Sequence, residues 1–210
     1  IKLILDAAHM SGTFVNHNSK IRHVGHEADV TVFSFQAVKN LPTADSGMIC
    51  FKDETDLDYC RKLSWLGIDK DTYSRSEIGG SYKWRYDVPH LGYKYHGNSI
   101  MAAIGLVQLK YLDDDNTHRR KICQYYESQL SDIKELQIIT DSPYCHTSSK
   151  HLFQVVVNSE DGKNRDSLMS HLASKNIFCG VHYISNLNYD IYKTGPEPEK
   201  ATFFSNKILS

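Results

Sequence analysis

The sequence lacks an excess of either charge, since 24 Lys and Arg stand against 25 Asp and Glu in 210 residues, a formal net charge of -1. Binding along a nucleic acid backbone depends on clustered Lys and Arg, so we expect no nucleic acid partner. The sequence also lacks a hydrophobic run near the roughly 20 residues that cross a bilayer, and it does not open with a signal segment. We therefore expect neither a membrane protein nor an exported one.

Paired cysteines are missing too. The five cysteines are odd in number, widely spaced and without a CxxC pair, namely Cys50, Cys60, Cys123, Cys145 and Cys179. This pattern argues against a disulfide framework and against a zinc site, and it fits a reducing, cytoplasmic location. Four histidines lie close together in the first part of the sequence: His9, His17, His23 and His26. They lack the fixed spacing of a metal site, and the turn residues among them predict a hairpin with histidines at its surface.

Hydrophobic residues make up 40% of the chain, which is enough for a core without a disulfide or metal. Three short apolar runs predict strands, and because they are nearly continuous they favour a sheet covered on both faces: Ile1–Leu5, Val30–Phe35 and Met48–Phe51. The chain opens with Ile inside the first of these runs. We expect it to be a piece of a longer protein.

Helical spacing appears over Asp56–Leu66 and over Asn98–Tyr111. The second segment begins at a good N-cap, Asn98, and places these residues on one stripe: Ile100, Ala103, Ile104, Val107 and Tyr111. Between them, Gly67–Gly97 has no clear periodicity, and such a long connection is more often functional than not. A third helix is expected from Lys121 to about Leu130.

The second part of the chain predicts a smaller α/β unit. A strand over Leu152–Val157, a helix over Arg165–Ser174 and a strand over Ile177–Val181 form a βαβ-like series. With the irregular stretch before it, this series predicts two domains, one over residues 1–130 and a smaller one over residues 131–210.

Polar residues follow the first strand in the series Asp6-Ala7-Ala8-His9. Open α/β sheets place their ligands at the carboxyl ends of their strands, so Asp6 and His9 are candidate binding residues. A carboxylate there needs a cationic partner or water, because an isolated buried charge is costly. The alternative is a helix N-cap aspartate next to a surface histidine.

A lysine follows the second strand in the series Phe33-Ser34-Phe35-Gln36-Ala37-Val38-Lys39-Asn40. An apolar setting would lower the pKa of Lys39 and free its amine to attack a carbonyl, forming a Schiff base. The alternative is that Lys39 is a solvated surface charge.

Taken together, these stretches resemble the DegT-type (DegT/DnrJ/EryC/StrS) nucleotide-sugar aminotransferases, which depend on pyridoxal phosphate. The resemblance runs through DAAH, the strand ending in SF, the Lys39-Asn40 pair and the GMI strand. It continues through WLGIDKDT, YDVPHLGYKYHGNSIMAAIGLVQL and GVHYI, and so covers nearly the whole chain. It implies an α/β fold of fold-type I, comprising part of the large domain's mixed sheet with flanking helices and the start of a small α/β domain.

The resemblance also implies roles for single residues. Asp6 would pair with the pyridinium nitrogen of pyridoxal phosphate, His9 would bond the phenolic oxygen, and Ser34 would contact the phosphate. Lys39 would hold the resting cofactor and move the proton between the two carbon centres.

Two regions depart from the family pattern. Lys94 replaces the asparagine that reaches the cofactor phosphate of the neighbouring subunit, with His96 and Gly97 in place of the usual arginine and methionine. A cation near a phosphate is chemically sensible, so the resemblance still implies a homodimer with shared active sites. His182 and Tyr183 keep only half of the VHY-x-PLH pattern, and they are the candidate substrate-binding residues.

The function implied is transfer of an amino group from an amino acid, with glutamate the expected donor, to a nucleotide-linked keto-deoxy-sugar. A sugar dehydratase of the same family is one alternative, but such enzymes replace the lysine with histidine, whereas position 39 is Lys. A non-catalytic cofactor-binding or regulatory protein is a second alternative, and a plain scaffold is a third.

Overall fold

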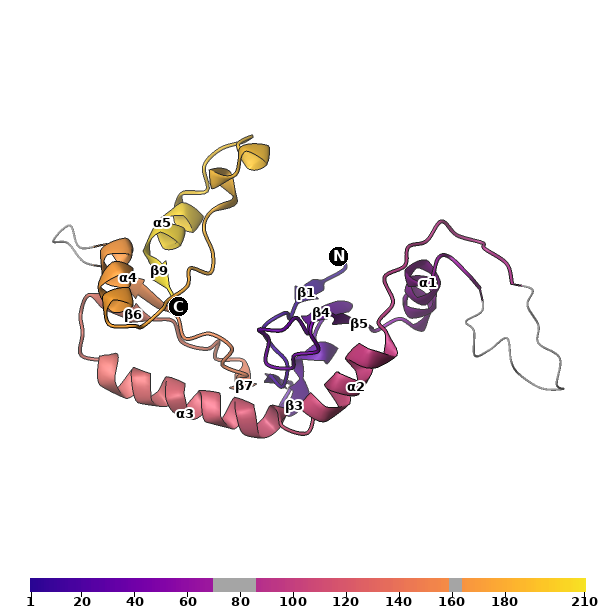
Figure 1. Cartoon of the computed structure of the whole chain (residues 1–210), viewed down its shortest axis with the longest axis horizontal. Helices are drawn as coiled ribbons and strands as arrows, with labels where there is room; N and C mark the ends of the chain where they lie inside the picture. Colours follow the sequence, from indigo (N-terminus) through magenta and orange to yellow (C-terminus); the bar gives the residue numbers. More distant parts are fainter. Residues whose placement is uncertain (70–85, 159–163) are drawn as a thin grey trace. The chain divides into compact units, whose positions relative to one another are not determined.

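The computed structural model describes residues 1–69, 86–158 and 164–210 (Figure 1). The chain divides into two compact units, Ile1–Asp115 and Asn116–Ser210, which are described separately. The predicted domain division at residue 130 stays a prediction. Over the described ranges, no helix is long and apolar enough to cross a membrane.

The first unit is built on a mixed sheet with the strand order β1-β4-β5. All three predicted strands are present, over slightly different ranges: β1 (Ile4–Asp6), β4 (Val30–Ser34) and β5 (Gly47–Phe51). β1 runs parallel to β4, with Asp6 opposite Val32, and β5 runs antiparallel to β4, with Ile49 opposite Val32. The carboxyl ends of β1 and β4 therefore meet at one edge of the sheet.

The described residues of the first unit cover the two faces of this sheet unequally. Ala7, Val24 and Phe33 form the buried core on that face. On the other face Ile4 is 70% exposed and Ile49 is 45% exposed. Among the described residues, the prediction that both faces are covered is therefore not met, because these side chains stay exposed.

The predicted histidine-bearing hairpin is present. Strands β2 (Phe14–His17) and β3 (Lys20–His23) pair antiparallel and lead into the short helix η1 (Val24–His26). The turn residues Asn18 and Ser19 have φ angles of 47° and 61°. Two successive left-handed residues suit the twist of a two-residue hairpin.

Two predicted helices of the first unit are confirmed, with different bounds. Helix α1 (Glu54–Ser64) is capped by the side chain of Asp53, and α2 (Ser99–Gln108) by that of Asn98. The predicted stripe of α2 is exposed, since Ile100 is 75% exposed.

A different face of α2 lies close to the segment that follows Lys39. A Cβ added at Gly105 would lie 3.2 Å from Cγ2 of Thr43. This small residue therefore lets α2 come close to the segment that follows Lys39, and the contact is made by Gly105 rather than by the predicted stripe.

Helix α3 (Leu112–Leu130) begins nine residues earlier than the predicted start at Lys121 and leads into the second unit. That unit contains a sheet with the order β6-β8-β9. Its elements are β6 (Leu136–Ile138), β7 (Cys145–Thr147), β8 (Val155–Val157), α4 (Arg165–Ser174), η3 (Asn186–Asn188), η4 (Asp190–Tyr192), α5 (Glu199–Lys207) and β9 (Ile208–Leu209).

The βαβ prediction for this unit is only half right. The helix α4 has the predicted bounds, and β8 forms within the first predicted strand. No strand forms over residues 177–181, although Gly180 exchanges backbone hydrogen bonds with Ser210. β6 and β9 flank β8 on its two sides, so neither edge of β8 is left for the predicted strand.

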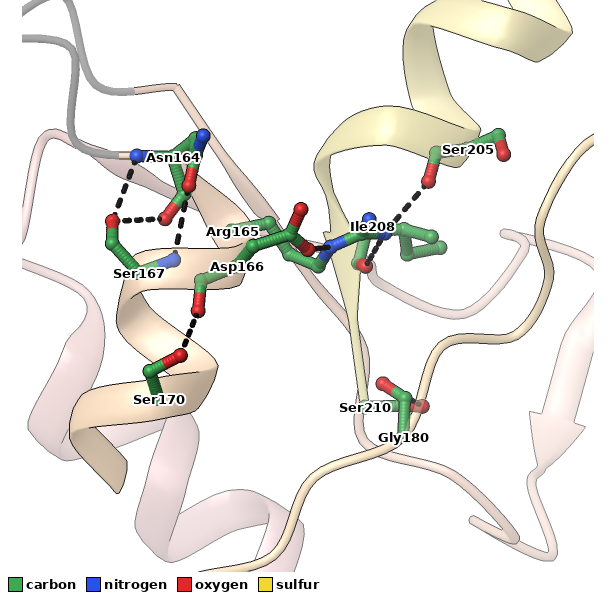
Figure 2. A network of polar contacts seen from close by, with 9 residues as sticks. All are labelled: Asn164, Arg165, Asp166, Ser167, Ser170, Gly180, Ser205, Ile208 and Ser210. Atoms are coloured by element: carbon green, nitrogen blue, oxygen red, sulfur yellow. Dashed lines mark hydrogen bonds and ion pairs between the residues drawn. The ribbon is translucent and has the colours of Figure 1, made fainter. Parts of the chain in front are cut away.

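Arg165 joins the first turn of α4 to the junction of α5 and β9 (Figure 2). Its Nη1 donates to the carbonyl of Ser205 over 2.8 Å and to that of Ile208 over 3.3 Å. Its Nε lies 2.6 Å from the carboxylate of Asp166. Asn164 and Ser167 cap the helix reciprocally beside it. Arg165 thus satisfies carbonyls that the end of α5 leaves without helical partners.

Candidate functional site

The end of β1 carries Asp6 and His9. The Asp6 carboxylate is exposed and accepts a hydrogen bond from the Ala8 amide over 3.0 Å. The Ala7 amide donates to the carbonyl of Val32 over 2.8 Å, which extends the pairing with β4 beyond the strand. His9 is half-buried. Turns follow β1 rather than a helix, so the alternative that Asp6 is a helix N-cap is wrong.

Ser34 ends β4 at the same edge of the sheet. Asp6 is opposite Val32, and Ser34 lies two residues further along β4. Residues two apart share a face of a strand, so Asp6 and Ser34 lie on the same, less covered face. The Ser34 hydroxyl is half-buried and accepts weakly from the Gln36 amide, over 3.4 Å.

Lys39 lies in the loop that leaves β4. Its amide donates to the carbonyl of Gln36 over 2.9 Å, and the Gln36 side chain accepts from the Val38 amide over 3.1 Å. Lys39 is half-buried, and Asn40 beside it is 6% exposed. A tight local turn therefore sets the position of Lys39, five residues after Ser34.

The base of this loop is closed by polar contacts. The Phe35 amide donates to the carbonyl of Ser46, and the Thr43 amide donates to that of Phe35, both over 2.8 Å. The hydroxyls of Thr43 and Ser46 are also hydrogen-bonded. A Cβ at Gly47 would lie 2.7 Å from the carbonyl oxygen of Phe33, so glycine permits the return into β5.

An open hollow of about 760 Å³ lies between this loop and α2. It is lined mainly by apolar groups, among them Phe35, Leu41, Met48 and Leu106, and by none of the predicted site residues. The predicted site therefore does not coincide with this hollow; it lies at the strand ends.

Lys94 lies in a segment that pairs with the end of α1. It forms an isolated β-bridge with Trp65, and its Nζ lies 5.9 Å from the centre of the Trp65 ring. The His96 ring meets the same indole edge-on, with centroids 4.0 Å apart. Sequence reasoning assigned Trp65 no role beyond its place in the WLGIDKDT motif, because its contact with Lys94 joins distant parts of the chain.

His182 and Tyr183 belong to the second unit. The Nδ1 of His182 is hydrogen-bonded to the Ser210 hydroxyl, and Gln154 donates to the His182 carbonyl over 3.2 Å. Tyr183 is 64% exposed. It lines an open hollow of about 450 Å³ with Ser185, Tyr192 and other residues of this unit. No sequence signal pointed to the contacts of Gln154 and Ser210 with His182, since each lies more than twenty residues from it in the chain.

Residues 1–209 match the model of the DegT/DnrJ/EryC1/StrS aminotransferase family. The chain belongs to this family. The resemblance drawn from the sequence motifs is thereby confirmed, and the α/β fold is that of fold-type I aminotransferases.

Solved structures of aminotransferases resemble the chain over its whole length. The aminotransferase TlmJ from Streptoalloteichus hindustanus is 28% identical, with a TM-score of 0.84 over 100% of this chain and 52% of that one. The putative sugar aminotransferase Spr1654 from Streptococcus pneumoniae, in its PMP-form, is 30% identical, with a TM-score of 0.83 over 100% and 53%. The chain thus spans about half the length of these relatives.

Proposed function

We propose that the protein is a pyridoxal-phosphate-dependent aminotransferase that moves an amino group from an amino acid, with glutamate the expected donor, to a nucleotide-linked keto-deoxy-sugar. The observation that carries the proposal is the placement of Asp6 and Ser34 on one face at the ends of neighbouring parallel strands, followed closely by Lys39. Membership of the aminotransferase family supports it. Spr1654, which has been solved in a PLP-form and a PMP-form, supports the cofactor.

The donor set fits this cofactor. Asp6 offers an exposed carboxylate for a protonated ring nitrogen, Ser34 offers a hydroxyl for the phosphate, and Lys39 offers a primary amine for the aldehyde. His9 offers an imidazole for the phenolic oxygen. Each group matches one functional group of pyridoxal phosphate in charge or hydrogen-bonding capacity.

When bound, pyridoxal phosphate supplies the electron sink that stabilises negative charge on the reacting carbon. The Asp6 carboxylate would keep the proton on the ring nitrogen, because a carboxylate favours the charged form of a neighbouring base. The Lys39 amine would take the proton from the substrate carbon of the donor and return one to the sugar carbon.

The second unit would bind substrate. Tyr183 is exposed, and the His182 ring is held through Nδ1 by Ser210, which sets its orientation. A side chain with a fixed orientation and an exposed aromatic neighbour suit the recognition of a sugar. We assign both residues to the substrate and place the protein in the cytoplasm as a homodimer, with Lys94 reaching the neighbouring subunit's site.

The alternatives make different predictions. A sugar dehydratase of this family would have histidine at position 39, where this chain has Lys. A non-catalytic cofactor-binding or regulatory protein, or a scaffold, would show no transfer of nitrogen.

The experiment uses the full-length protein. Borohydride reduction with bound pyridoxal phosphate, followed by peptide mapping, should place the cofactor mass on Lys39; a Lys52→Ala variant is the matched control. Glutamate with a labelled amino nitrogen should then pass its label to a nucleotide-linked keto sugar. Cofactor found on Lys52 or Lys62 would contradict the site, and bound cofactor without any transfer of label would contradict the activity.

A further inference from the structure

The Lys94 segment is held against the end of α1 by its backbone. The Tyr93 amide donates to the carbonyl of Leu63 over 2.7 Å, and the Leu66 amide donates to that of Tyr93 over 2.9 Å. The Tyr95 amide donates to the carbonyl of Ser64 over 2.9 Å. These bonds flank Lys94 on both sides, so its Cα has a fixed place relative to Trp65.

Two glycines allow this close contact. A Cβ at Gly92 would lie 2.1 Å from the backbone nitrogen of Gly67, and one at Gly67 would lie 1.8 Å from the carbonyl oxygen of His90. Gly67 also has a φ of 75°, which side chains rarely adopt. The two backbones therefore touch, which leaves little freedom to the segment that carries Lys94.

The indole of Trp65 restricts the lysine side chain in turn. The Nζ of Lys94 lies 5.9 Å from the ring centre, within the range of a cation–π attraction. The His96 ring packs edge-on against the same indole, at 4.0 Å and 85°. Among the ion pairs of the described residues, none involves Lys94. Its charge thus stays available to an anion from elsewhere.

We propose that Trp65 is a positioning residue for Lys94, holding the ammonium group in place to meet the phosphate of the cofactor. This inference rests on the proposed function, because it takes pyridoxal phosphate as the anion. A free lysine loses substantial rotamer entropy when it binds. Trp65 reduces that loss before the phosphate arrives, so phosphate affinity depends on an indole that never touches it.

The test measures the affinity of the full-length protein for pyridoxal phosphate and for pyridoxal, which lacks the phosphate. We expect Lys94→Met to weaken pyridoxal phosphate binding roughly ten- to a hundredfold, as loss of a charge-assisted contact does. Trp65→Leu should weaken it about two- to fivefold, the size of one cation–π contact. Neither change should alter pyridoxal binding by more than about twofold, since pyridoxal offers no phosphate.

Tyr59→Leu is the matched control. Tyr59 lies on α1, whereas Trp65 directly follows its last residue, and Tyr59 packs edge-on against His90, with centroids 4.9 Å apart. The substitution removes an aromatic contact between α1 and the segment that carries Lys94, but it leaves Lys94 itself untouched. It should therefore leave the affinity for both ligands unchanged. Trp65→Met keeps an apolar side chain without a ring face, and it replaces Trp65→Leu if that variant does not fold.

The double variant Trp65→Leu/Lys94→Met decides whether Trp65 acts through Lys94. We expect it to bind pyridoxal phosphate as Lys94→Met alone does. Three outcomes would each show that Trp65 only packs the loop. The losses of affinity in the two single variants could multiply in the double variant, or Trp65→Leu could lose equal affinity for pyridoxal phosphate and for pyridoxal. Tyr59→Leu could also lose as much affinity as Trp65→Leu. Failure of the wild-type protein to bind pyridoxal phosphate would overturn the proposed function, and this inference with it.

Discussion

Asp6 lies opposite Val32 in the parallel pair of β1 and β4, and this register places Asp6 on the same sheet face as Ser34. Parallel pairing brings the carboxyl ends of two strands to one edge, although about two dozen residues separate them in the chain. The hairpin and η1 fill that interval. The register of β1 on β4 is therefore the feature of the fold on which the proposed cofactor site depends.

Asp6→Asn should reduce turnover much more than cofactor binding. The carboxylate would act on the protonated ring nitrogen, whereas Ser34 and Lys39 would still hold the cofactor. Loss of a charge-assisted hydrogen bond costs roughly 1.5–3 kcal/mol, which predicts a ten- to a hundredfold decrease in kcat. Asp45→Asn is the control, since it makes the same change of charge at an exposed position of the Lys39 loop. Wild-type turnover by Asp6→Asn would remove Asp6 from the site.

Arg165→Leu should destabilise the second unit. The Arg165 side chain is only 11% exposed and donates to the carbonyls of Ser205 and Ile208 (Figure 2). Without it these acceptors lose a charged donor, at a cost of about 1.5–3 kcal/mol. Denaturant unfolding followed by circular dichroism measures the shift. Arg61→Leu removes an arginine whose ion pair with Asp58 is exposed, and it should change stability by less than about 1 kcal/mol. Equal changes in stability would mean that the hydrogen bonds of Arg165 contribute no more than the exposed ion pair of Arg61.

His23 should make the first unit less stable in mild acid. Burial, and secondly the charge of His26, lowers the pKa of His23 below its usual value of about 6.5. Its Nδ1 also accepts from the Gly25 amide over 3.3 Å, which requires the neutral ring. Below about pH 6.5 the unfolded chain therefore binds a proton before the folded chain does, and stability falls as the pH falls toward the lowered pKa.

His23→Gln tests that dependence, because it removes the titrating group. The slope of stability against pH between roughly pH 5 and 6.5 should become smaller in this variant, whatever its stability at neutral pH. An unaltered slope in His23→Gln would mean that the His23 pKa is the same in the folded and unfolded chains.

Local sequence signals predicted the parts of the fold that depend on neighbouring residues. Asn98 caps α2, the Asn18-Ser19 pair turns the hairpin, and α4 has the predicted bounds. Each of these features is decided within a few residues, where side-chain capping and backbone preference act directly.

The errors concern distant partners. Residues 177–181 have a sequence suited to a strand, but β9, from the far end of the chain, pairs with β8 instead. The stripe of α2 that carries Ile100 is exposed, and Gly105 instead marks the face that approaches the Lys39 loop. The contact of Trp65 with Lys94 likewise joins segments about thirty residues apart, so periodicity could not reveal it.

Lys94 should act in the neighbouring subunit's site of a homodimer. A mixed dimer with one Lys39→Ala subunit and one Lys94→Glu subunit distinguishes the two possible arrangements. If Lys94 acts across the interface, both changes fall in one site and the other site is intact, so about half of the wild-type activity should remain. If it acts within its own subunit, each site carries one change and both are inactive. The comparison requires that each variant be inactive as a homodimer and that the mixed dimer be purified through two different tags. Activity near zero from well-folded mixed dimers would then exclude the cross-subunit contact. It would leave the Trp65–Lys94 relationship in place, because that contact lies within one chain.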